Sequence, residues 1–341
     1  MKPSSLVGQV GNLRPVANRP AHEGQLAIGR RLPTCPTLAV LLLAANGFAQ
    51  PSAGDIHIWP VQGNLYLLVS PGGNMAVQAG KDGVLLVDTG TGKFNNQILA
   101  AIRTISDKPI RYILTTHFHA DHTGGNEALA KAGVTIEGGP GFGAIGVNTG
   151  TPQGAHVYAH ENVLNRMSAP SGKQSPVPTS FWPTDTYFVG DREVFFNGEA
   201  IQMIHQPAAH TDGDSIIYFR RSDVVAAGDI FVTTTFPVID LASGGTIQGE
   251  IDGLNKILDL TIPEHEQEGG TYVIPGHGRI CDEADVVEYR DMVTIIHDRI
   301  RDMKKKNMTL EQVKASRPAR DFDARYGDPT AFVEAVYRTL K

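Results

Sequence analysis

The chain has 341 residues, which is enough for one large two-layered domain or two small ones. Hydrophobic residues make up 41% and charged residues 19%, an ordinary globular composition that predicts a substantial core. No stretch approaches the ~20 apolar residues that a membrane-spanning helix needs, so we expect no membrane span.

The first 49 residues differ in composition from the rest of the chain. They carry five basic residues against one acidic residue, and a short apolar run at residues 38–45 follows the basic ones. Gly47-Phe48-Ala49 then resembles a small-x-small cleavage site. This order predicts a bacterial signal peptide at residues 1–49, cleaved after Ala49, and hence a periplasmic or secreted protein. A disordered tail with an incidental apolar patch is the alternative.

Removal of this leader changes the formal net charge from −6 to −10, because five positive charges and one negative charge leave with it. An acidic domain argues against a nucleic-acid substrate, since such a site needs basic residues that replace the counterions of the phosphates. The leader also takes Cys35 with it. Cys281 then remains alone, which excludes an internal disulfide in residues 50–341.

The first half of that domain alternates short apolar runs with turn residues. We predict strands at residues 64–69, 74–78 and 83–87, separated by Pro71-Gly72-Gly73 and Lys81-Asp82. Residues 93–105 have apolar side chains at helical spacing, and residues 112–114 form a short apolar run typical of a buried strand.

Residues 115–125 carry the strongest chemical signal in the chain. Three histidines and an aspartate fall within six residues, at His117, His119, Asp121 and His122, between the strand at 112–114 and a helix for which Asn126 is a plausible N-cap. Imidazole and carboxylate groups suit zinc or a similar divalent ion. On an extended segment residues 117 and 119 point the same way, while 121 and 122 straddle a turn and can face elsewhere. This layout favours two neighbouring metals over one; a loop with ordinary surface histidines is the alternative.

The second half repeats the organisation of strands followed by loops. Residues 138–183 are rich in Gly, Pro and Ser, with a strand-like piece at 155–160 and a short helix near 161–167. A stretch this irregular is usually functional or mobile. Phe181 and Trp182 line a groove or simply pack, and His156 and His160 are expected to be surface or supporting groups rather than ligands. Further strands are predicted at residues 193–204, 215–219, 223–227 and 271–274. Helices are predicted at residues 247–260, 283–306 and 329–340, and a capping box at Thr309 predicts the start of another.

His-x-His-x-Asp-His followed by Gly-Gly resembles the signature of the metallo-β-lactamase superfamily. Further markers of that family follow in its order over residues 56–280: Asp88 in Leu-Val-Asp-Thr-Gly, His210 in Ala-Ala-His-Thr-Asp, Asp229 after the apolar run at 224–227, and His277 in Pro-Gly-His-Gly. The resemblance implies an α/β (α+β) protein with a four-layered αββα sandwich. The helices after residue 283 would form a C-terminal extension of one domain at residues 50–341.

The resemblance also implies the metal ligands. His117, His119 and His210 would hold one zinc ion, Asp121, His122 and His277 a second, and Asp229 would bridge the two. Hydroxide between the two ions would be the nucleophile, with Asp121 as the catalytic residue that orients it and passes a proton to the leaving group. Cys281 has no role in this scheme and is expected to be a buried small residue.

The substrate is not settled by the fold. We expect an exported zinc hydrolase that cleaves a carbonyl ester, lactone, thioester or β-lactam-type bond of a small molecule. A true metallo-β-lactamase, a glyoxalase II-like thioesterase and an exported metal-binding accessory protein without turnover are the alternatives. The di-iron, redox-active branch of the family typically has a glutamate where this chain has His119, which favours zinc and hydrolysis.

Overall fold

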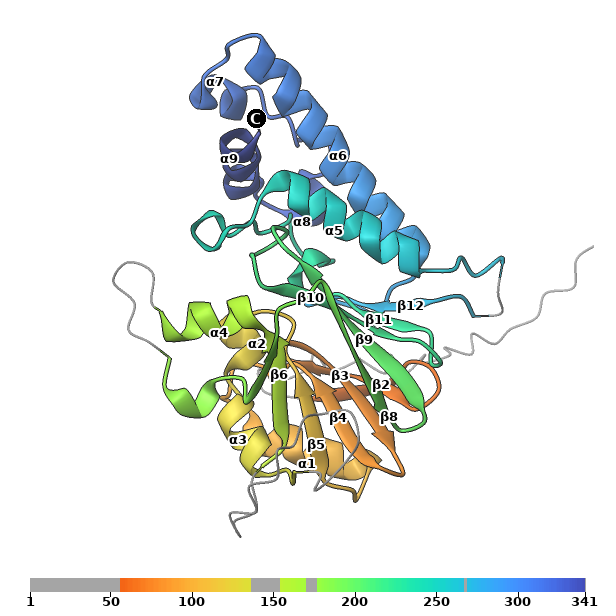
Figure 1. Cartoon of the computed structure of the whole chain (residues 1–341). Coiled ribbons are helices and arrows are strands. Elements are labelled where there is room, and N and C mark those ends of the chain that lie inside the picture. Colours follow the sequence, from red (N-terminus) through yellow and green to blue (C-terminus); the bar gives the residue numbers. More distant parts are fainter. Residues whose placement is uncertain (1–55, 136–153, 170–176, 267–268, 341) are drawn as a thin grey trace, which may run out of the picture. The chain divides into compact units, whose positions relative to one another are not determined.

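Two β-sheets, one from each half of the chain, organise the part of the protein that the computed structural model describes, residues 56–135, 154–169, 177–266 and 269–340. The predicted leader at residues 1–49 lies outside the described residues, all of which belong to the unit Gln50–Lys341. The first sheet has the order β1-β2-β3-β4-β5-β6-β7 and the second β12-β11-β10-β9-β8 (Figure 1). The strands are β1 (His57–Pro60), β2 (Leu65–Ser70), β3 (Gly73–Gly80), β4 (Gly83–Val87), β5 (Ile110–Leu114), β6 (His156–His160), β7 (Asp185–Tyr187), β8 (Asp191–Phe196), β9 (Glu199–Gln206), β10 (Asp214–Phe219), β11 (Val224–Ala226) and β12 (Tyr272–Ile274).

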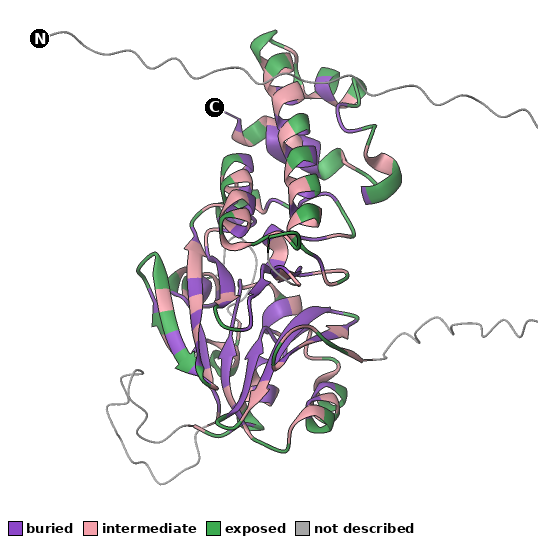
Figure 2. Ribbon diagram, turned by 90° about the vertical axis from the view of Figure 1, so that its right-hand side faces the viewer, coloured by how far each residue is buried: buried purple, intermediate pink, exposed green. Residues whose placement is uncertain are grey.

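Strand β4 shows why the sheets stack. Successive side chains of a strand point to opposite faces, so a strand that is apolar at every position must be covered on both sides. Leu85 and Val87 pack between the two sheets, while Val84 and Leu86 pack on the opposite face against helices. Residues along most of both sheets are accordingly buried (Figure 2).

Helices cover the outer face of each sheet. Ile98 and Ile102 of α1 (Asn95–Ile105) and Leu129 of α3 (Asn126–Lys131) pack on the first sheet, and α5 (Ile247–Leu260) and α6 (Glu283–Lys305) cover the second. The order is therefore helix, sheet, sheet, helix, and the predicted αββα sandwich is confirmed. Among the described residues, no helix combines the length and the apolarity needed to cross a bilayer.

The prediction of one strand at residues 193–204 was wrong. The chain forms a hairpin, in which β8 and β9 pair antiparallel around Asn197 and Gly198. Both turn residues have positive φ, 50° and 83°, the left-handed conformation that a two-residue hairpin turn requires. Asn-Gly is the strongest short-range signal for such a turn.

The segment of residues 115–125, which carries four of the predicted ligands, is more regular than predicted. Its residues Ala120–Thr123 form a short helix, α2. Asn126 is not an N-cap: it is the first residue of α3, and Gly125 precedes it as the cap. The side chain of Asn126 is buried, accepts a hydrogen bond from Thr89 Oγ1 at 2.9 Å and donates to the Phe181 carbonyl at 3.0 Å. It therefore joins two neighbouring loops. Of the loop-rich stretch, residues 136–153 and 170–176 lie outside the described part; β6 and α4 (Glu161–Ser168) form as expected.

The C-terminal extension packs around α6. Capping boxes start α6 at Asp282 and α7 (Leu310–Ala315) at Thr309, the second as predicted. A four-residue helix that was not predicted, α8 (Asp323–Tyr326), precedes α9 (Thr330–Thr339). Apolar side chains of α6, α7, α8 and α9 share one core cluster with α5 and with the second sheet, so the extension is part of the domain.

A buried carboxylate connects the two sheets. Glu199 on β9 accepts hydrogen bonds from the side chain of Gln78 on β3 at 2.6 Å and from the Ser222 hydroxyl at 2.8 Å. Its second oxygen accepts from the backbone N–H groups of Arg221 and Ser222 at 3.1 and 3.0 Å. Every partner is a donor, so the site is matched to a carboxylate and not to an amide.

We expect Glu199→Gln to lower the free energy of unfolding by about 2–4 kcal/mol, because the new amide would direct N–H groups at buried donors. Urea unfolding would measure the loss. Glu193→Gln is the matched control: Glu193 lies on β8 and its ion pair with Arg220 is exposed, so it should change stability by less than about 1 kcal/mol. Equal effects of the two substitutions would contradict this account.

Candidate metal centre

The predicted ligands lie at the carboxyl ends of strands from both sheets. β5 leads into the loop with His117, His119, Asp121 and His122; β9 leads to His210, β11 to Asp229 and β12 to His277. β9, β11 and β12 run in the same direction, because β10 is antiparallel to both β9 and β11 and β12 is parallel to β11. Strands that run in the same direction deliver their following loops to one edge of a sheet.

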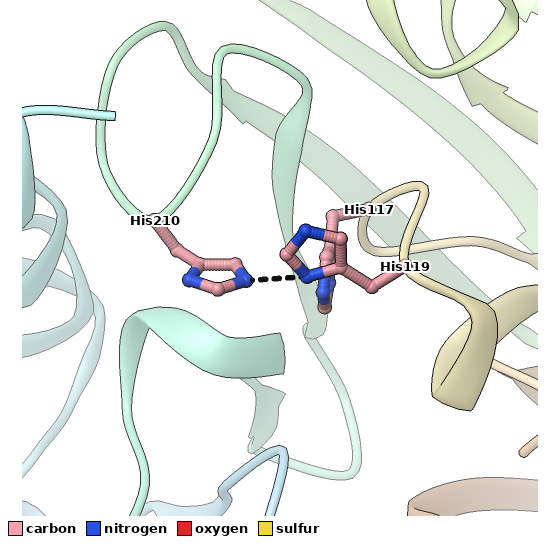
Figure 3. Close-up of side chains that lie close together, drawn as sticks. All are labelled: His117, His119 and His210. Atoms are coloured by element: carbon pink, nitrogen blue, oxygen red, sulfur yellow. Dashed lines mark hydrogen bonds between the residues drawn. The ribbon is translucent and has the colours of Figure 1, made fainter. Parts of the chain in front are cut away.

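His117, His119 and His210 form the first of two groups whose ligand atoms lie within 4.8 Å of one another. Their rings approach edge to face, with centroids 4.7–4.8 Å apart. Nε2 of His210 and Nδ1 of His119 are 2.9 Å apart (Figure 3). The three rings thus surround one point, as the ligands of a single ion would.

Acceptors outside the group fix which nitrogen of each histidine faces that point. Nε2 of His119 donates to Oδ2 of Asp240 at 3.1 Å, and Nδ1 of His210 donates to the Val238 carbonyl. The inward nitrogens, His119 Nδ1 and His210 Nε2, therefore both present lone pairs when the rings are neutral. Two lone pairs 2.9 Å apart repel each other unless a cation lies between them. This geometry fits a metal ion.

Asp121, His122, Asp229 and His277 form the second group. Nε2 of His122 is 3.2 Å from Oδ1 of Asp229, and Nε2 of His277 is 3.4 Å from that same oxygen and from Oδ2 of Asp121. His122 is fully buried, whereas the side chains of Asp121 and His277 are 37% and 32% exposed. The second group is therefore closed on one side and open to solvent on the other.

Asp229 lies between the two groups. Its Oδ1 faces His122 and His277, while its Oδ2 is 3.9 Å from Nε2 of His210 in the first group. Asp229 Oδ1, His117 Nε2 and His122 Nε2 are buried and form no hydrogen bond. Buried polar atoms without a partner are costly, and a metal ion in each group would satisfy all three. The donor set of histidine nitrogens and carboxylate oxygens fits zinc.

Asp88 orients His122 from behind. Its Oδ2 accepts from Nδ1 of His122 at 2.8 Å and from the Thr116 hydroxyl at 2.7 Å, and its Oδ1 accepts from the Thr116 N–H at 2.7 Å. Asp88 has a φ of 63°, a conformation that is uncommon for residues other than glycine and that is held here by these bonds. The carboxylate keeps Nε2 of His122 directed into the second group.

Gly276 is required by its closeness to Asp229. A Cβ atom at this position would lie 1.9 Å from Oδ1 of Asp229 and 2.9 Å from the backbone of Gly228, so a larger residue would displace that carboxylate. The side chain of Asn74 donates to the carbonyls of Pro275 and Gly278 at 2.8 and 3.0 Å and so holds the turn that carries His277. The Pro-Gly-His-Gly motif therefore has a structural as well as a chemical reason.

Burial and neighbouring charges shift the pKa values of the ligand histidines in different directions. Burial, and then the neighbouring His122, lower the pKa of His117 well below its usual value. Burial also acts to lower the pKa of His122, but the carboxylates of Asp229 and Asp88 raise it well above the usual value. The carboxylates of Asp121 and Asp229, each 3.4 Å from Nε2 of His277, raise the pKa of His277 to about 9. In the metal-free protein, protons on His122 and His277 therefore supply the positive charge that a metal ion would bring to the second group.

The other residues singled out in the sequence lie outside the two groups. His156 pairs with Asp185, and His160 stacks on His205 with ring centroids 3.5 Å apart. Phe181 and Trp182 pack against the small cluster of Ala159, Val163 and Met167. Cys281 is buried, and burial raises the pKa of its thiol to about 12, so it is a neutral thiol under ordinary conditions.

Sequence reasoning missed three groups that support the ligands: Asp240, the Val238 carbonyl and Asn74. Asp240 and Val238 lie more than 25 residues from the histidines they contact, and Asn74 about 200 residues from the turn it holds. A backbone carbonyl has no sequence signal, and Asp240 and Asn74 are ordinary turn residues. Contacts of this kind become visible only in the folded chain.

A protein-family model matches the part of the chain that contains nearly all of both sheets and all seven predicted ligands. The model of the metallo-beta-lactamase superfamily matches residues 59–277, more than half of the chain. The chain belongs to the metallo-beta-lactamase superfamily. The family predicted from the motifs is therefore confirmed.

Two named proteins are similar to this chain in sequence. A linear primary-alkylsulfatase from Pseudomonas sp. is 25% identical over 301 residues, which cover 76% of this chain and 52% of that protein. A protein of Schizosaccharomyces pombe described as "Probable hydroxyacylglutathione hydrolase glo2" is 29% identical over 140 residues, 36% of this chain and 54% of its own length. The chain spans about half the length of these curated relatives. Both names are those of hydrolases.

Solved structures show the same fold at low sequence identity. The inverting sec-alkylsulfatase Pisa1 from Pseudomonas sp. superimposes with a TM-score of 0.59 at 17% identity, covering 83% of this chain and 50% of that chain. A metallo-beta-lactamase from Pontibacter korlensis gives a TM-score of 0.50 at 16% identity, covering 70% of this chain and 99% of that chain. These similarities establish the fold and leave the substrate open.

We expect Asp240→Asn to weaken zinc binding by the first group about tenfold, because the neutral amide supports His119 less well than a carboxylate does. Competition against a chromophoric chelator would measure the affinity. Asp252→Asn, an exposed change on α5, is the control and should leave it unchanged. An Asp240→Asn variant with normal zinc affinity would show that His119 does not need this partner.

We expect zinc binding to release protons near neutral pH. A metal ion binds only neutral imidazole, and His277, with a pKa of about 9, is protonated there in the metal-free protein. Raising the pH toward that value should therefore strengthen binding to the second group. Calorimetry in two buffers with different ionisation enthalpies would count the protons. Binding heats that do not depend on the buffer would contradict the prediction.

Proposed function

We propose that the chain is an exported hydrolase that uses two zinc ions to cleave an ester-type bond in a small molecule. The observation that supports it most is the carboxylate of Asp229, which directs one oxygen at each ligand group. A carboxylate in that position is suited to bridging two ions. His117, His119 and His210 would hold one ion, Asp121, His122 and His277 the other, and the bound pair would lower the pKa of a water molecule to near neutrality.

Asp121 is the residue we assign to proton transfer. Its side chain is 37% exposed, so it borders both the ligand group and the solvent-filled side from which a substrate would approach. Burial acts to raise the pKa of this carboxyl, but the hydrogen bond with His277 lowers it below its usual value. An ionised carboxylate can orient the attacking water, accept its proton and pass it to the leaving group.

Two bond types are candidates for the substrate. A carbonyl ester, lactone or thioester follows from the ligand set and from the partial relation to the hydroxyacylglutathione hydrolase. An alkyl sulfate ester follows from the relation to the linear primary-alkylsulfatase, which covers 76% of this chain. The β-lactamases superimpose at 16–18% identity, which supports β-lactam hydrolysis no further than the fold itself.

Export is part of the proposal and rests on residues 1–49 alone. Their basic flank, apolar run and Gly47-Phe48-Ala49 support a signal peptide. Mass spectrometry of protein recovered from the periplasm or the medium should find an N-terminus at Gln50. Recovery of the intact leader on cytoplasmic protein would refute export.

Metal analysis together with a substrate panel tests the activity. Protein expressed with zinc available should contain about two zinc ions per chain, and it should hydrolyse at least one member of a panel of thioesters, lactones, β-lactams and linear alkyl sulfates. Fully loaded protein that is inactive on all four classes would favour a metal-binding accessory protein instead.

We expect Asp121→Asn to reduce kcat by at least ~10²-fold at full metal occupancy, because the amide keeps the size of the side chain but cannot accept a proton. Cys281→Ala is the control: its thiol is neutral and buried, and hydrolysis should stay within about twofold of the original rate. Zinc content would be measured on both variants. Full activity of Asp121→Asn, or loss of activity in Cys281→Ala, would sink this mechanism.

A further inference from the structure

One loop contacts three of the ligand histidines from outside the metal centre. Residues 231–240, here called the rim loop, leave the short turn that carries Asp229 and end at Asp240. The Thr233 N–H donates to the carbonyl of His277 at 3.0 Å. The Val238 carbonyl accepts from His210, and Asp240 accepts from His119 and donates its N–H to the His210 carbonyl at 2.9 Å. The orientation of two of the three histidines of the first group therefore depends on the path of this loop.

The rim loop forms no helix or strand, so packing rather than a hydrogen-bond ladder sets its path. Its anchor is Phe236, which is 3% exposed. The Phe236 ring stacks almost parallel to that of Phe332 on α9, with centroids 5.9 Å apart and an angle of 13°, and lies 5.5 Å from the ring of Tyr326 on α8. The hydroxyl of Tyr289 on α6 donates to the Thr235 carbonyl at 3.3 Å.

All of these anchoring partners belong to the C-terminal extension. Phe332, Tyr326 and Tyr289 lie on three helices after residue 277, where the match to the superfamily model ends. Within the described chain, the extension thus contacts the loop that orients the first group, and it contributes none of the seven predicted ligands. Helices that only covered the second sheet would not need to contact residues 235 and 236.

We propose that the C-terminal extension positions the histidine group of the metal centre, with Phe332 and Tyr326 acting through Phe236 and the rim loop. The chain of contacts is continuous: Phe332 packs on Phe236, two residues before Val238 and four before Asp240. If this packing is loosened, the acceptors for His210 and His119 lose their fixed positions. The first group should then bind zinc less tightly, while the second group keeps its affinity, because Asp88 orients His122 and Asn74 holds the turn that carries His277. This inference rests on the proposed metal function.

The test is a zinc titration of metal-free protein in competition with a chromophoric chelator. Phe332→Ala should weaken one of the two binding steps about tenfold, the lower end of the effect of losing an outer partner, and leave the other step unchanged. The weakened step should be the one that Asp240→Asn weakens. The double variant Phe332→Ala/Asp240→Asn should lose less zinc-binding free energy than the sum of the two single losses, because both substitutions act through the rim loop. Phe332→Leu, which keeps most of the side-chain volume, should recover most of the affinity.

Ile300→Ala is the matched control for a general loss of stability. Ile300 is buried in the same core cluster, but it lies 11 residues along α6 from Tyr289, ~16 Å away at the rise of an α-helix. It should lower the midpoint of unfolding about as much as Phe332→Ala and leave both zinc affinities intact. If Phe332→Ala does not fold, Tyr326→Leu, which removes the other ring packed against Phe236, should weaken the same binding step.

Three results would overturn the inference: unchanged zinc affinities in both Phe332 variants, equal weakening of both steps, or the same weakening in Ile300→Ala. These results differ from failure of the proposed function. In that case the unaltered protein itself would bind no zinc, and the inference would fall with the metal centre.

Discussion

The arrangement of the metal centre depends on one shared carboxylate. Asp229 can face both ligand groups because the ends of β11 and β12 lie beside each other, with Gly276 of the next turn directly against its Oδ1. Each group by itself would be an ordinary cluster of ionisable side chains. In the proposed mechanism, ions held by the two groups that Asp229 joins would activate a water on one side and stabilise the developing charge on the other.

Neither half of the chain can build either group alone. The first group combines two histidines from the loop after β5 with His210 from the loop after β9, and the second combines Asp121 and His122 with Asp229 and His277. Ligand atoms from different sheets meet only if the sheets stack in a single arrangement. The apolar layer between them, together with the hydrogen bonds of Glu199 across it, therefore fixes the geometry of the centre as well as the stability of the fold.

The sequence predicted what is encoded locally. Ligand types at close spacing after an apolar strand marked His117, His119, Asp121 and His122, and the resemblance to the superfamily added His210, Asp229 and His277; the structure brings all seven together. Most strands and helices fell within a few residues of their predicted bounds. The Asn197-Gly198 hairpin was missed although its local turn signal was present. Asp240 and Asn74 could not be found in this way, since their importance comes from contacts that depend on the packed sheets and on the path of residues 231–240.

The unequal exposure of the ligands has a kinetic consequence. His117, His122 and His210 are almost inaccessible, whereas His119, Asp121 and His277 have side chains 27–37% exposed, so each group has a closed inner side and an outer side that water reaches. Ions in such a centre can leave stepwise through the open side, with the exposed ligands detaching first, while the sheets stay folded. A small chelator would then strip the ions without denaturing the protein. The metal content of a purified sample would therefore depend on the metal ions and chelators in the solutions used to prepare it.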